Sequence, residues 1–73
     1  MKTVEEAREA LEQARAALRE FNKGLTLEQA TKMSVGDPTT VEVLGLKNSQ
    51  AILLESIINA EQELQDAKKA EAH

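Results

Sequence analysis

The longest apolar pattern of the chain covers residues 41–67. Apolar or small residues, with one glutamine among them, recur there at alternating steps of three and four, the spacing of one face of an α-helix. These positions are Val43, Leu46, Gln50, Leu53, Ile57, Ala60, Leu64 and Ala67. Three further apolar residues, Ile52, Leu54 and Ile58, widen this face, so we expect the helix to have more than one neighbour.

A second helix is predicted at the N-terminus. Thr3 and Glu6 have the spacing of a capping box, in which each side chain accepts a hydrogen bond from the backbone of the other. The same three-four spacing follows, and its alanines allow a neighbouring helix to approach closely. We expect this helix to cover residues 4–23 and Gly24 to end it in the left-handed conformation. Its apolar positions are Val4, Ala7, Leu11, Ala14, Leu18 and Phe21.

A short helix is predicted between these two. Thr26 and Gln29 repeat the capping-box spacing, and the helix should end near Ser34. Asp37 is a good N-cap and Pro38 suits a first helical position, so the long helix should begin there. Gly45 is its weak point, because glycine costs about 1 kcal/mol relative to alanine inside a helix.

The resulting fold class is mainly α, in a single domain of residues 1–73. We expect the long C-terminal helix to pack antiparallel on the N-terminal helix, with the short helix between them. The alternative is an α+β fold with a β-hairpin at residues 33–43, since β-branched residues alternate there around a Gly-Asp-Pro turn. In that alternative the long helix begins only near Asn48 or Ser49.

Size and composition favour association with another protein. A single core in 73 residues supplies only about 3–5 kcal/mol, and this chain has one aromatic residue and no cysteine to form a disulfide. Oligomerisation or docking on a partner is the expected additional source of stability. The chain has no apolar run of membrane-spanning length and no N-terminal signal segment, so we expect a cytoplasmic protein without a membrane partner.

Acidic residues dominate the C-terminal third of the chain. Residues 49–73 contain two lysines and five acids, within a chain of net charge −4. This balance disfavours contact with a nucleic-acid backbone and suits a basic protein surface, although a solvated helix face has the same composition. The five acids are Glu55, Glu61, Glu63, Asp66 and Glu71.

No residue pattern indicates catalysis or a bound cofactor. His73 is the only histidine and is the last residue, either native or the remainder of a purification tag. Glu61 and Glu63 point about 160° apart on a helix, so they cannot converge on a metal ion. The three glycines form no phosphate-binding loop, and no histidine is placed to activate a serine. We therefore expect no enzyme activity, no small-molecule substrate, no cofactor and no metal.

Residues 26–44 resemble the helix-turn-helix of LacI-type repressors in the spacing of Leu27, Ala30, Val41 and Leu44. This resemblance implies that residues 37–44 open a recognition helix for DNA. The segment departs from the family pattern in its turn, Ser34-Val35-Gly36, and it contains one lysine against three acids. It offers no arginine, and residues 37–44 offer no asparagine or glutamine to read bases.

Residues 11–24 resemble the first helix of gpW-type phage head-to-tail joining proteins. The hairpin and second helix of that family would then correspond to the hairpin alternative and the long helix. The family's basic tail has no counterpart here. This resemblance implies a self-associating structural subunit.

The function predicted from the sequence is non-enzymatic binding of another protein by a helix face. Its most concrete form is a small phage- or plasmid-type regulator or inhibitor that docks on a larger host machine such as RNA polymerase. The alternatives are the self-associating, homo-oligomeric subunit and the DNA-binding protein. Nine residues are predicted to bind the partner: Val41, Val43, Leu44, Leu46, Leu54, Ile58, Glu61, Glu63 and Asp66.

Overall fold

The computed structural model describes residues 2–72 and consists of three helices. They are α1 (Val4–Gly24), α2 (Leu27–Val35) and α3 (Val41–Glu71), and the described residues contain no strand. The all-helical prediction is confirmed. The hairpin alternative at residues 33–43 is wrong, because its two arms lie at the end of α2 and the start of α3. His73 lies outside the described residues.

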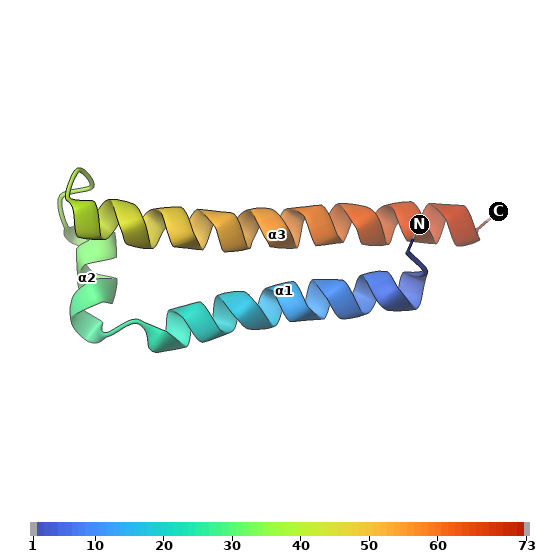
Figure 1. Ribbon diagram of the computed structural model, residues 1–73, viewed down its shortest axis with the longest axis horizontal. Coiled ribbons are helices and arrows are strands. Elements are labelled where there is room, and N and C mark those ends of the chain that lie inside the picture. The colour runs from blue at the N-terminus through green and yellow to red at the C-terminus, as the bar shows by residue number, and fades with distance from the viewer. Residues whose placement is uncertain (1, 73) are drawn as a thin grey trace.

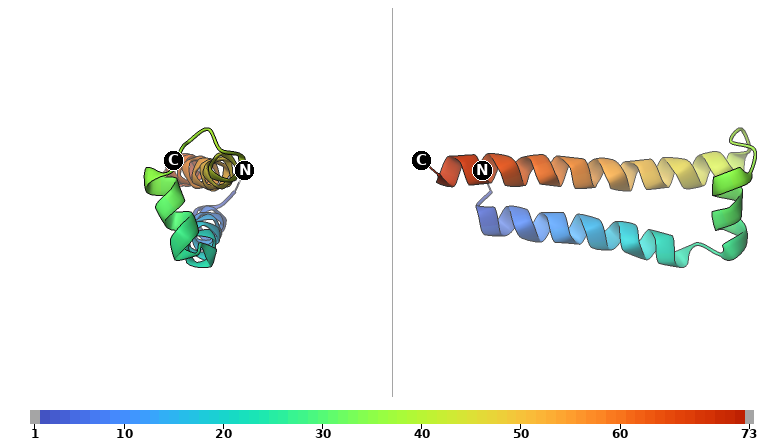
Figure 2. Two further views of the ribbon diagram at one scale, coloured as in Figure 1. Left: turned by 90° about the vertical axis from the view of Figure 1, so that its left-hand side faces the viewer. Right: turned by 180° about the vertical axis from the view of Figure 1, so that it is seen from behind.

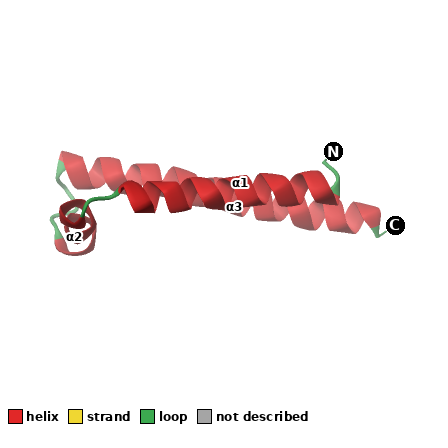
Figure 3. Cartoon of the chain, turned by 90° about the horizontal axis from the view of Figure 1, so that it is seen from below, coloured by secondary structure: helices red, strands yellow, loops and turns green. Residues whose placement is uncertain are grey.

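The two long helices lie side by side and run in opposite directions (Figure 1). The short helix α2 crosses from the end of α1 to the start of α3, so it closes one end of the hairpin (Figure 2). The start of α1 and the end of α3 lie at the other end, where Val4 contacts Glu71. Seen from below, α1 and α3 cross at a shallow angle (Figure 3), as expected for antiparallel helices with a continuous apolar contact.

Both predicted capping boxes are present. The Glu6 backbone N–H donates to the Thr3 hydroxyl at 3.1 Å, and the Thr3 N–H donates to the Glu6 carboxylate at 3.4 Å. The Gln29 N–H donates to the Thr26 hydroxyl and the Thr26 N–H to the Gln29 side chain, both at 3.0 Å. These bonds satisfy backbone donors that have no partner inside a helix, and thereby fix where α1 and α2 begin.

Two predicted helix ends are wrong in detail. Gly24 is the last residue of α1, but its φ is not positive, so it is not left-handed. Leu25 follows in an extended conformation, and its N–H donates to the Asn22 carbonyl. The start of α3 is Val41 rather than Pro38, with Thr40 as the N-cap. Gly45 causes no break, since α3 continues through it.

Asp37 caps a turn instead of a helix. Its carboxylate accepts hydrogen bonds from the Thr39 N–H at 2.8 Å and the Thr39 hydroxyl at 2.7 Å. These two bonds favour the ionised form and lower the pKa of Asp37 below its ordinary value of 3.8. The Thr40 N–H donates to the Asp37 carbonyl at 3.2 Å, with Pro38 in the second position of the turn, where its fixed φ is favourable.

The core is a single layer of side chains between α1 and α3, which continues under α2 at the first turns of α3. The antiparallel register is visible in the contacts from Val4 N–H to Glu71 at 3.3 Å and from Arg15 to Glu61 at 3.8 Å. This register places Ala7, which is 0% exposed, level with Ala67, which is 1% exposed. We call the eight three-four positions of α3 from Val43 to Ala67 the apolar seam, and all eight are buried or half-buried, as are the six of α1.

The hairpin exposes more surface than a globular protein of its size. The molecule measures 50 × 20 × 15 Å, and its radius of gyration of 15.8 Å exceeds the value of about 11 Å expected for a compact chain of this length. Its accessible surface is 5386 Å², against about 4,450 Å² expected for a monomer of 8.0 kDa. The excess is therefore about 900 Å² by the same scaling.

Candidate interaction surface

One flank of α3 carries a row of apolar side chains that stay exposed to solvent in the hairpin. Leu44 is 53% exposed, Leu54 44% and Ile58 64%, and Ala51 is also exposed. At 100° per residue these four positions share one side of the helix, next to the seam. We call Leu44, Ala51, Leu54 and Ile58 the α3 ridge.

Polar residues continue the same row. Lys47, Glu61 and Gln65 fall on the ridge flank at the same three-four spacing, and all three are exposed. The complete row is thus a second heptad-like pattern beside the seam, displaced from it by one residue. It reads Leu44, Lys47, Ala51, Leu54, Ile58, Glu61 and Gln65.

The remaining exposed apolar residues do not join the ridge. Val41, 88% exposed, and Ile52, 56% exposed, lie on a different side of α3 by helical geometry. Leu27 and Val35 are exposed on α2, which buries none of its residues. Single apolar side chains of this kind are ordinary on protein surfaces, whereas a continuous row is not.

Two of the predicted partner-binding residues face the rest of the chain instead of the ridge flank. Val43 is 2% exposed and Leu46 is half-buried, because both belong to the seam. Their side chains stabilise the contact with the rest of the chain, so we leave them out of the surface available to a partner. Leu44, Leu54 and Ile58 remain on it.

The three acids predicted to face a partner do not form one patch. Glu61 pairs with Arg15 at 3.8 Å, and Glu63 pairs with Lys2 at 2.8 Å. Asp66 accepts a hydrogen bond from the Gln62 side chain at 3.0 Å. Glu61 and Glu63 lie on opposite sides of α3, so their charges are directed apart.

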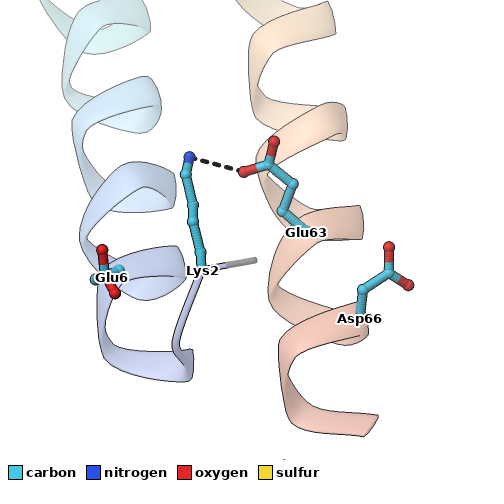
Figure 4. A pocket seen from close by; sticks show the side chains of 4 residues that line it. All are labelled: Lys2, Glu6, Glu63 and Asp66. Atoms are coloured by element: carbon cyan, nitrogen blue, oxygen red, sulfur yellow. Dashed lines mark hydrogen bonds and ion pairs between the residues drawn. The ribbon is translucent and has the colours of Figure 1, made fainter. Parts of the chain in front are cut away.

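A shallow, open hollow lies between the ends of α1 and α3. Lys2, Glu6, Glu63 and Asp66 line it, and the Lys2 side chain reaches across to Glu63 (Figure 4). Neither Glu6 nor Asp66 joins that contact. Within residues 2–72, no cluster of three or more acidic, histidine or cysteine side chains is arranged to hold a metal ion.

The segment that resembles a helix-turn-helix has its lysine engaged within the chain. Lys32 Nζ lies 2.9 Å from the Glu42 carboxylate and 3.2 Å from that of Glu28. The first turn of α3 exposes Val41, Glu42 and Leu44, which offer no cation to a phosphate backbone. This surface therefore does not favour DNA binding.

Comparison with protein-family models, characterised proteins and solved structures finds no match for this chain. Its class rests on its own geometry, an antiparallel hairpin of two long helices that a short helix connects. No helix in the described part combines the length and the apolar character needed to cross a membrane.

Sequence reasoning missed three members of the ridge row, Lys47, Ala51 and Gln65. A signal for them was available, because the row has the same three-four spacing as the seam. These three residues can be assigned to the exposed flank only once it is known which side of α3 is covered by α1.

Proposed function

We propose that this chain is a non-enzymatic protein-interaction module that binds another protein through the α3 ridge. The observation that carries the proposal is the exposure of Leu44, Leu54 and Ile58 in one row beside an already filled seam. Burying them removes apolar surface from water, at about 25 cal/mol per Å². A row of helix positions at this spacing is the form in which helices dock on one another.

The apolar row supports the proposal better than the acidic charges do. Glu61 and Glu63 already have cationic partners within the chain and point to different sides. An exposed ion pair contributes little to binding, whereas buried apolar anchors near the middle of an interface contribute most. We accordingly place the contact on the ridge. A basic surface of a larger machine, such as host transcription machinery, is the alternative partner.

Site-specific photo-crosslinking in native cells tests this proposal. A benzophenone amino acid replaces Ile58 on the ridge, and a matched control carries it at Ser56, which is exposed on another side of the same helix. We expect the probe at position 58 to give a discrete covalent adduct, and the probe at position 56 to give little. Equal labelling from both positions, or no adduct from position 58, would refute the proposal.

A further inference from the structure

We propose that the partner of the α3 ridge is the same ridge of a second copy, packed antiparallel across a two-fold axis at Leu54. This inference rests on the proposed function, because it names the partner of that surface. In such an isologous dimer each contact occurs twice, once from each chain. The row of one copy must then be complementary to the same row of the other copy, which runs in the opposite direction.

The spacing of the row meets this condition. When a second copy is turned end to end about Leu54, Leu44 comes level with the partner copy's position 65 and Ala51 with its position 58. Lys47 comes level with position 61, and Leu54 meets its own equivalent. The two residue numbers of each pair add up to 108 or 109. A constant sum means that one antiparallel register aligns every pair along the row of about 30 Å.

The charges select the antiparallel direction. In this register Lys47 of each copy lies opposite Glu61 of the other, which places two attractive pairs at either side of the apolar centre. A parallel pair would instead bring Lys47 against Lys47 and Glu61 against Glu61. Flanking charges of this kind set partner choice and orientation in paired helices. The Arg15–Glu61 contact of 3.8 Å is a loose one, which leaves the carboxylate accessible.

The side-chain volumes select the same direction. Ala51, the smallest member of the ridge, lies opposite Ile58 of the other copy, so a small side chain faces a large one on each side of Leu54. A parallel arrangement would pair Ala51 with Ala51 and leave a gap between the helices. Close packing without such voids is what makes a helix contact specific.

The excess surface of the whole chain is comparable in size with one interface. The surface in excess of a compact monomer is about 900 Å², and a stable interface buries about 800 Å² on each partner. One contact along the ridge therefore brings the accessible surface of each chain close to that of a compact protein. The short helix α2 lies across the end of the hairpin (Figure 1), and Ala51, Leu54 and Ile58 in the middle of the ridge are exposed.

Charge reversal tests the inference on the purified full-length chain. We expect the wild type to sediment at twice the 8.0 kDa mass of one chain. The variants Lys47→Glu and Glu61→Lys should each raise the dimer Kd by roughly tenfold, because each converts two attractive pairs into two repulsive ones. The double variant should recover the affinity. The two single changes shift the net charge in opposite directions, so a general charge effect would not weaken both.

Mixing the two single variants gives the sharper result. The Lys47→Glu chain carries an acid at both flanking positions and the Glu61→Lys chain carries a lysine at both, so both contacts between the two chains become attractive. With one variant isotope-labelled, native mass spectrometry should show heterodimer well above the half expected for random pairing. Circular dichroism of each variant checks that the helices are intact.

A wild-type chain that stays monomeric up to about 1 mM, or a random mixture of the two variants, would overturn the inference. The proposed function fails separately. A monomeric chain whose position 58 still crosslinks to a different protein in cells would retain the interaction module and exclude the second copy.

Discussion

The Lys32 ammonium lies 2.9 Å from the Glu42 carboxylate, and this contact joins α2 to the first turn of α3. Glu28, one turn earlier on α2, lies 3.2 Å from the same nitrogen. The α2 helix buries none of its residues, so its position depends on few contacts and this ion pair is one of them. Hydrogen bonds to Glu42, the larger effect, and to Glu28 raise the pKa of Lys32 above its ordinary value of 10.5.

The Lys32 contact should make the docking of α2 sensitive to high pH. A raised pKa means that the contact favours the folded state fully below pH 10.5 and that this contribution is lost as the pH rises through the raised value. The methyl resonance of Met33, half-buried on α2, should therefore shift in that range. In Lys32→Met the shift should be absent. An identical transition in both proteins would show that the ion pair does not hold α2.

Ala67 should tolerate no larger side chain. It is 1% exposed and level with Ala7, which is 0% exposed, so the helices approach closely at this end of the hairpin. Ala67→Leu forces the helices apart and should lower the free energy of unfolding by about 1–3 kcal/mol. Ala70→Leu, at an exposed position of the same helix, is the matched control and should be nearly neutral. Urea unfolding of both variants measures the difference, and equal stability would contradict the register.

Gly36 should be needed for the turn between α2 and α3. A β-carbon there would lie 2.4 Å from the Lys32 carbonyl oxygen, so Gly36→Ala must displace the backbone and should cost about 1–3 kcal/mol of stability. Gly45→Ala is the matched control, because its added methyl meets no atom within 4 Å. That change should stabilise α3 by up to about 1 kcal/mol. Thermal unfolding measures both variants, and a shift of their unfolding temperatures in the same direction would contradict this account.

The helix starts of α1 and α2 were predictable because their capping boxes are local. Thr3 with Glu6 and Thr26 with Gln29 involve only neighbouring residues, so the sequence contains everything that decides them. The role of Asp37 could not be predicted from local spacing. Its carboxylate can cap a helix that begins at Pro38, or accept hydrogen bonds from Thr39 in a turn, in which case α3 begins at Val41.

The candidate surface was only partly predictable. The apolar excess of α3 is visible in the sequence, but Val43 and Leu44 are neighbours with similar side chains, and only one is buried. Which one is covered depends on the side of α3 that α1 and α2 occupy. The partners of Glu61 and Glu63 are Arg15 and Lys2; the first contact follows from the antiparallel register, and the second from the Lys2 side chain, which reaches across from the segment before α1. Neither contact can be read from local spacing.

Disulfide formation at single introduced cysteines tests the central claim most directly, because the chain has no cysteine of its own. A disulfide needs α-carbons within about 7 Å. In the proposed antiparallel pair the two Leu54 residues meet, whereas the two Leu44 residues lie about 30 Å apart. We predict that Leu54→Cys forms a covalent dimer under mild oxidation, and that Leu44→Cys and the control Ser56→Cys do not. Equal crosslinking at positions 44 and 54, or none at 54 above the control, would contradict the account.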